Sequence, residues 1–163
     1  MKRAALAIIV LALLCAAHPL AAPDAIFIVR HAERADASAD SPLSAAGEAR
    51  AEHLAALLKD AGITQILTTD VQRTIQTGAP LAAALHIASA ALKAGDQDAL
   101  LARLRAASAD DRILVVGHSN TVPPLLHALG VAPDVTIDDA EYDNLFLVVT
   151  REGAPTQFFR FRF

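Results

Sequence analysis

Two histidines in this chain each follow directly after a short apolar run. His31 comes after Ala25–Val29 and Arg30, and His118 comes after Ile113–Gly117. Such a run predicts a buried strand, and α/β sheets bind ligands at the carboxyl ends of their strands. Arginine matches the geometry of phosphate oxygens, and neutral imidazole is a nucleophile. The sequence therefore predicts one anion site that holds both histidines, and phosphoryl transfer is the chemistry that this site suggests.

A second arginine is expected at the same place. Arg73 follows the apolar run 63–68 and should lie in the first turn of the next helix, at the sheet end that carries His31. Thr68 or Thr69 is expected to cap that helix, whose N-terminal amides add positive potential. Arg30 and Arg73 are thus predicted to bind the phosphate group.

The elements that must position these residues alternate between strand and helix signals after Pro23. Strands are expected at 25–29, 63–68, 88–92, 112–116, 144–150 and 156–163, and helices at 44–60, 71–85, 97–107 and 121–129. Ser44 is the expected N-cap of the first helix, and Pro80 is expected to kink or split the second. This order predicts an α/β fold: a three-layer α/β/α sandwich with a mainly parallel sheet and a C-terminal antiparallel edge hairpin.

The first 22 residues have a pattern of their own. Residues 1–3 are basic at Lys2 and Arg3, residues 4–15 are apolar, and small residues follow around His18. This pattern predicts a signal peptide over 1–22, cut after residue 17 or near 21–22, and a single domain over 23–163. The apolar run is shorter than the roughly 20 residues that a membrane-spanning helix needs. We expect an exported protein, periplasmic or secreted, with no stable membrane association after signal removal.

Composition argues against several classes of function. Loss of Lys2 and Arg3 takes the formal charge from −4 to −6, so a basic surface for nucleic acid is not expected. Cys15 is the one cysteine and lies in the predicted signal, which leaves no disulfide framework or cysteine-based zinc site. Two histidines without matching carboxylates are too few ligands for a metal ion. We therefore expect no cofactor and no metal.

Four segments, in this order, resemble the histidine phosphatase superfamily, which has the phosphoglycerate-mutase-like fold. They are Val29-Arg30-His31-Ala32-Glu33, Leu43-Ser44-x-x-Gly47, Thr68-Thr69-x-x-x-Arg73-Thr74-x-Gln76-Thr77 and Val116-Gly117-His118-Ser119-Asn120. The resemblance covers essentially all of residues 23–163. It implies a metal-independent phosphatase in which His31 is phosphorylated and Arg30, Arg73 and His118 complete the phosphate pocket. The compact chain, without a large inserted cap, resembles the short bacterial phosphohistidine phosphatases of the superfamily.

The proton donor departs from the family pattern. Many members have a glutamate after the helix of the pocket arginine, but no glutamate stands between Arg73 and Arg112. The acid phosphatase branch places an aspartate directly after the second histidine, where this chain has Ser119. The remaining candidates for the donor are Glu33, Asp96, Asp98, Glu141 and Asp143. A leaving group of low pKa, such as a phosphoramidate imidazole, needs less help from an acid.

Arg34 is a further candidate for the pocket. It stands three residues after His31, as an additional pocket arginine does in the acid phosphatase branch, although the proline that usually follows is missing. The residues Asp138-Asp139-Ala140-Glu141, by contrast, are interpreted as a solvated acidic loop.

Three functions stay open. The favoured one is an exported phosphatase that acts on phosphate monoesters or other phosphoryl groups, small-molecule or protein-borne, through a phosphohistidine intermediate. The missing acid also fits a non-catalytic phosphate- or phospholigand-binding module of the same fold. The third is a phosphoglycerate-mutase-type phosphotransferase, for which the sequence offers no dedicated second phosphate site.

Overall fold

A single six-stranded sheet organises the computed structural model, which describes residues 23–131, 133–150 and 154–163. The strand order is β3-β2-β4-β1-β5-β6. The parallel strands are β1 (Ala25–Arg30), β2 (Gln65–Thr69), β3 (Ser89–Leu92) and β4 (Arg112–Gly117), and the antiparallel edge hairpin is β5 (Asn144–Val149) and β6 (Gln157–Arg162). The predicted fold class is confirmed. The predicted signal peptide lies outside the described residues.

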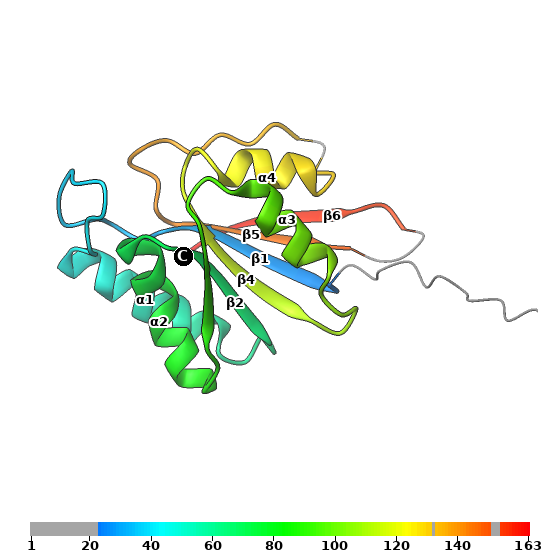
Figure 1. Cartoon of the computed structure of the whole chain (residues 1–163), viewed down its shortest axis with the longest axis horizontal. Helices are drawn as coiled ribbons and strands as arrows, with labels where there is room; N and C mark the ends of the chain where they lie inside the picture. Colours follow the sequence, from blue (N-terminus) through cyan, green and yellow to red (C-terminus); the bar gives the residue numbers. More distant parts are fainter. Residues whose placement is uncertain (1–22, 132, 151–153) are drawn as a thin grey trace, which may run out of the picture.

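Helices cover both faces of this sheet (Figure 1), as the three-layer prediction requires. On one face α1 (Ala45–Leu58) and α2 (Gln72–Leu85) pack Leu54, Leu58 and Leu81 against Val29 and Leu114. On the other face α3 (Gln97–Arg105) and α4 (Val122–Ala128) pack Leu104, Leu125 and Leu126 against Ile26, Ile113 and Phe146. The alternating inward residues of β1 and β4 thus supply both cores, since successive strand side chains point to opposite faces.

The helix starts agree only in part with the sequence prediction. Ser44 caps α1 as expected, because its side chain accepts a hydrogen bond from the Gly47 amide. Neither Thr68 nor Thr69 caps α2: Val71 is the N-cap and makes no side-chain cap bond. Instead the carboxylate of Asp40, from the loop before α1, accepts from the Gln72 amide at 2.8 Å. The unpaired amide N–H groups at a helix start can donate to any nearby oxygen, whether it is local or distant in sequence.

Pro80 does not split α2, which runs from Gln72 to Leu85 without a break. A proline removes one helical hydrogen bond, but burial of the helix face opposes the break. Thr77, Gly78 and Leu81 lie on that buried face. No helix within the described ranges is long and apolar enough to cross a membrane.

Parallel pairing of β1, β2 and β4 brings three strand ends to one edge of the sheet. Arg30 lies opposite Gly117, and Thr68 lies opposite Val116. Just beyond the strands, the His31 amide donates to the Gly117 carbonyl at 2.9 Å. This pairing places the two chemically important histidines next to each other.

Candidate active site

His31 and His118 face each other at the carboxyl end of the sheet. Their ring centroids are 5.2 Å apart and their planes meet at 64°, an edge-on arrangement. Both residues are almost fully buried, with 4% and 9% of their surface exposed. The sequence prediction of a shared site therefore agrees with their placement.

His31 is held in one tautomer. Its Nδ1 lies 2.7 Å from the Ala32 carbonyl, and because a carbonyl can only accept, Nδ1 carries the proton and Nε2 keeps its lone pair. The Ala32 amide is held in turn by Thr77 Oγ1 at 3.0 Å. Burial lowers the pKa of His31 to about 4, against the raising effect of the Ala32 hydrogen bond, so the ring is neutral near pH 7. A neutral imidazole with a free Nε2 is a nucleophile.

His118 contacts two side chains, one on each ring nitrogen. Nε2 lies 3.0 Å from Thr69 Oγ1, and Nδ1 lies 3.4 Å from Nη2 of Arg73. Burial, followed by the positive charges of Arg73 and Arg30, lowers the pKa of His118 to about 4. The His118 amide donates to Thr121 Oγ1, which anchors the turn into α4.

Arg30 is clamped by the loop that precedes β5. Its Nη1 donates to the backbone carbonyls of Asp138, Asp139 and Glu141 at 2.9, 2.9 and 3.1 Å. The ring of Tyr142 covers the guanidinium at 4.1 Å, within the range of a cation–π contact. The interpretation of 138–141 as a solvated acidic loop agrees with its exposed residues 138–140, and in addition three backbone carbonyls of this segment accept from Arg30.

Arg73 is tethered in a similar way by the loop between β1 and α1. Its Nη1 donates to the Ala39 carbonyl at 2.8 Å. The Nε atoms of both Arg30 and Arg73 are buried without a hydrogen-bond partner. A buried N–H without an acceptor costs free energy, so both donors favour an incoming anion. Both arginines are thus held in place at this end of the sheet, and a role for them in anion binding stays a prediction.

A face of α2 holds the loop 35–43 against the site. Gln72 Nε2 donates to the Asp40 carboxylate at 3.0 Å, and Gln76 Oε1 accepts from the Leu43 amide at 2.7 Å. Sequence reasoning assigned no role to Asp40 or Gln76. The signal for Gln76 was its place in the segment Thr74-x-Gln76-Thr77, where residues one helical turn apart share a face.

The candidate proton donors are occupied by other partners. Glu33 is bound by Arg50 at 2.8 Å, and Glu141 and Asp143 are bound by Arg162 at 2.8 and 2.5 Å. Asp96 caps α3 by accepting from the Ala99 amide at 2.9 Å, and Asp98 is exposed in the first turn of that helix. The structure does not bring these five carboxylates together, and it adds no contact from any of them to His31 or His118 among the described residues.

Arg34 lies at the edge of the site. It is exposed and pairs with Leu43 in an isolated antiparallel bridge. Burial, followed by the positive charge of Arg34, lowers the pKa of Arg73, which puts the two guanidinium groups within electrostatic range. A role of Arg34 in phosphate binding stays a prediction.

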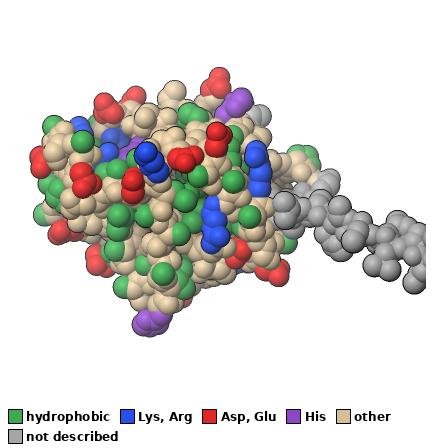
Figure 2. Space-filling model, viewed as in Figure 1, with side chains coloured by type: hydrophobic (Ala, Val, Ile, Leu, Met, Phe, Trp, Pro, Cys, Tyr) green, Lys and Arg blue, Asp and Glu red, His purple; other side chains and the backbone are tan. Residues whose placement is uncertain are grey.

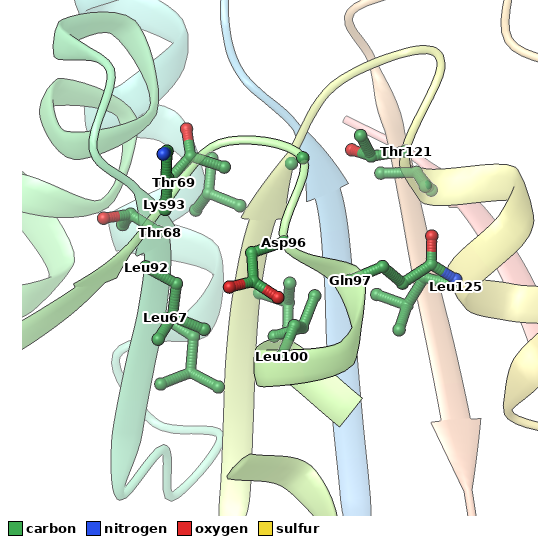
Figure 3. A pocket seen from close by; sticks show the side chains of 15 residues that line it. Leu67, Thr68, Thr69, Leu92, Lys93, Asp96, Gln97, Leu100, Thr121 and Leu125 are labelled. Atoms are coloured by element: carbon green, nitrogen blue, oxygen red, sulfur yellow. The ribbon is translucent and has the colours of Figure 1, made fainter. Parts of the chain in front are cut away.

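An apolar pocket adjoins the site between β2, β3, β4, α3 and α4. Figure 3 shows its lining, with Asp96 and Gln97 at the start of α3 and Thr121 before α4. Thr69 and Gly117, which flank His118, also line it. The molecular face in Figure 2 carries acidic and basic side chains interspersed. Within the described ranges, no group of three or more histidine, cysteine, aspartate or glutamate residues could hold a metal ion.

Sequence comparison covers the segments that hold Arg30, His31 and Arg73, and it ends before His118. Residues 26–94 match the family model of the histidine phosphatase superfamily (branch 1). Over this segment the chain is similar to this superfamily. Over 66 residues it is 39% identical to the probable phosphoglycerate mutase GpmB of Proteus mirabilis (strain HI4320), a match over 36% of this chain and 31% of that protein. The chain thus matches less than a third of the length of this curated relative.

Solved structures show the same fold over most of the chain. The putative phosphohistidine phosphatase SixA from Agrobacterium tumefaciens is 22% identical, with a TM-score of 0.66 over 84% of this chain and 96% of that one. A SixA protein histidine phosphatase complexed with tungstate is 24% identical, with a TM-score of 0.66 over 85% and 96%. A putative alpha-ribazole-5'-P phosphatase from Escherichia coli is 15% identical, with a TM-score of 0.69 over 85% and 96%. The fold of this chain thus covers 96% of each of these three structures.

Proposed function

We propose that this chain is a member of the histidine phosphatase superfamily and a metal-independent phosphatase that works through a phosphohistidine on His31. One observation carries the proposal: the Nδ1 proton of His31 is held by the Ala32 carbonyl, which leaves Nε2 unprotonated on a ring that lies beside His118 and within electrostatic range of Arg30 and Arg73. Nothing in that arrangement needs a cofactor. A nucleophile and an anion clamp are the two parts that phosphoryl transfer requires.

The proposed reaction has two steps. First, Nε2 of His31 attacks phosphorus, the P–N bond forms, and the bond to the leaving group breaks with its electron pair. Then water attacks the phosphohistidine, the P–N bond breaks, and phosphate leaves with His31 neutral again. Arg30, Arg73 and His118 hold the transferring group in both steps, since its charge stays negative throughout.

The leaving group is proposed to be one of low pKa. Glu33, Glu141 and Asp143 are engaged by arginines, so none of them is free to protonate an alkoxide. Aryl phosphates and phosphoramidates need less protonation than alkyl phosphates. We therefore propose small-molecule or protein-borne substrates of this type, including phosphohistidine, in keeping with the fold that the chain shares with the protein histidine phosphatase SixA.

The test is turnover of an aryl phosphate in the presence of EDTA, with a search for an acid-labile phosphoprotein. Wild type should turn over and become labelled, and His31→Ala should lose both. His127→Ala is the matched control, because His127 is an exposed histidine on α4. Activity that survives His31→Ala would overturn the mechanism, and loss of activity in EDTA would overturn metal independence.

A second candidate, the non-catalytic phosphate-binding module, is favoured by the occupied carboxylates. It predicts that inorganic phosphate binds the wild type but that neither turnover nor labelling occurs. A mutase would instead move a phosphoryl group between two positions of one substrate without net release of phosphate.

Export is a separate proposal, supported by the pattern of residues 1–22. Fractionation of cells that express the full chain should place the protein outside the cytoplasm, with a mass that lacks the leader. Full-length protein in the cytoplasmic fraction would contradict export.

A further inference from the structure

A chain of hydroxyl groups leads away from His118. Thr69 Oγ1 lies 3.0 Å from Nε2 of His118 and 2.8 Å from Thr74 Oγ1. Thr74 Oγ1 lies 3.0 Å from the Thr69 carbonyl and 2.8 Å from the Val71 carbonyl. Thr74 is completely buried, so these hydroxyls have fixed partners.

The directions of these hydrogen bonds follow by elimination. Carbonyls only accept, so the Thr74 hydroxyl donates its one proton to a carbonyl. In its contact with Thr69 Oγ1 it must therefore be the acceptor. The Thr69 hydroxyl has then used its own proton and accepts from Nε2 of His118. At the other ring nitrogen, Arg73 can only donate, so Nδ1 of His118 presents its lone pair. The contacts of both ring nitrogens therefore require the same tautomer of His118, with the proton on Nε2.

We propose that Thr69, backed by Thr74, is a positioning residue that keeps the proton of His118 on Nε2 and so reserves Nδ1 for the transferring phosphoryl group. The proposal rests on the proposed function, because it assigns an atom of the same site. When a phosphoryl group enters, Nδ1 takes a proton from solvent and donates it in a hydrogen bond to a phosphoryl oxygen. Because Nε2 is already protonated, Nδ1 is the ring atom left to take that proton.

The charges around His118 suit this uptake. Arg30 faces it from the end of β1, His31 from just beyond that strand, and Arg73 from α2. Tyr142 lies against His31 at 6.0 Å between ring centroids. The two cationic arginines disfavour an imidazolium in the empty site. A phosphate dianion reverses the sign of the local charge and favours one. Proton uptake at Nδ1 is thereby linked to binding of the anion.

The first test reads the tautomer directly. The ¹⁵N spectrum of wild-type His118 should show a protonated Nε2 and an unprotonated Nδ1, and inorganic phosphate at mildly acidic pH should protonate Nδ1. In Thr69→Val the Nε2 proton has no acceptor, so the other tautomer should become populated. A protonated Nδ1 in the free wild type, or an unchanged spectrum in Thr69→Val, would overturn the proposal whether or not the protein turns over.

The second test is kinetic and has a matched control in the neighbouring residue. Thr68 is a buried threonine on the same strand whose Oγ1 has no partner. Thr69→Val should lower kcat about 10- to 100-fold with a smaller change in KM, the loss typical of removing a group that orients a histidine. Thr68→Val should stay near wild type, and Thr69→Ser should recover most of kcat. If Thr68→Val lost as much kcat as Thr69→Val, the loss would come from altered packing at the strand end, and the role of the Thr69 hydroxyl would be overturned. A failure of the proposed function would instead abolish turnover in the wild type.

Discussion

Glu33 and Arg50 form a two-point ion pair directly beside the nucleophile segment. Arg50 Nε lies 3.0 Å from each carboxylate oxygen of Glu33, and Nη2 lies 2.8 Å from Oε1. The carboxylate nearest in sequence to His31 is therefore anchored to α1. Burial alone raises the pKa of the Glu33 carboxyl, but the Arg50 hydrogen bond and charge outweigh it, so that pKa is below its ordinary value.

Glu33→Gln should lower stability and leave catalysis nearly intact. A hydrogen bond between charged groups that are three-quarters buried is worth about 1–2 kcal/mol, so the free energy of unfolding should fall by about that amount. The stabilisation by this pair is present above the ordinary carboxyl pKa and is lost as pH falls through the lowered value. Urea unfolding measures the stability, and aryl phosphate turnover measures catalysis. The control is Glu48→Gln, because Glu48 is an exposed glutamate of α1. A large loss of kcat at unchanged stability would restore Glu33 as the proton donor.

Tyr142 should support anion binding through its ring. Tyr142→Ala removes the face that covers Arg30 and should weaken binding of inorganic phosphate by about 3- to 10-fold, since exposed to partly buried cation–π contacts are worth about 1 kcal/mol. Calorimetric titration measures the affinity. Tyr142→Phe keeps the ring and should bind like wild type. An equal loss in both variants would show that the hydroxyl, and not the ring, matters.

Asp40 should stabilise α2 from outside the helix. Asp40→Ala removes the acceptor of the Gln72 amide and should cost about 1 kcal/mol of unfolding free energy, the usual value of an N-cap. It should also raise KM for phosphate esters, because the Ala39 carbonyl next to Asp40 tethers Arg73. Asp40→Asn keeps an oxygen acceptor and should recover most of the stability. A normal KM in Asp40→Ala would show that the Arg73 tether is independent of the cap.

Gly47 should tolerate no side chain. A Cβ at this position would overlap the Glu33 carbonyl oxygen, a backbone atom that cannot turn aside. Gly47→Ala should therefore cost about 1–3 kcal/mol of unfolding free energy, as overpacking usually does. Ala46→Ser, at the exposed neighbouring position, is the control for the helix turn and should be close to neutral. Wild-type stability of Gly47→Ala would contradict the close approach of α1 to this segment.

The two buried histidines should make stability depend on pH. Each has a folded-state pKa of about 4, below its ordinary value of 6.5, so the unfolded chain binds more protons between these values. The free energy of unfolding should fall as pH drops through this window, by up to about 1.4 kcal/mol per pH unit for each histidine. His31→Gln and His118→Gln should each flatten the slope, measured by urea unfolding from pH 7 to 4. An equally flattened slope in His127→Gln would contradict the assignment to the site.

Local pattern was enough to predict the strands and helices and the edge at which they place His31, His118 and Arg73. Hydrophobic runs fix which residues are buried, and parallel strands must end at one edge, so residues that follow such runs converge there. The cap of α2 could not be predicted in this way. Asp40 lies 32 positions before Gln72, and a cap of that kind depends on a loop's path.

By itself, then, the sequence determined the layered α/β architecture and the pair of histidines with their arginines, because periodicity and residue type act locally. Only the tertiary structure decided what holds those residues: the carbonyls of 138–141 on Arg30, Arg50 on Glu33, and the hydroxyls of Thr69 and Thr74 behind His118. Each of these partners is a backbone group or a polar side chain that no sequence motif or hydrophobic periodicity marks. Its role arises from the need of every buried donor for an acceptor, which only the packed chain can satisfy.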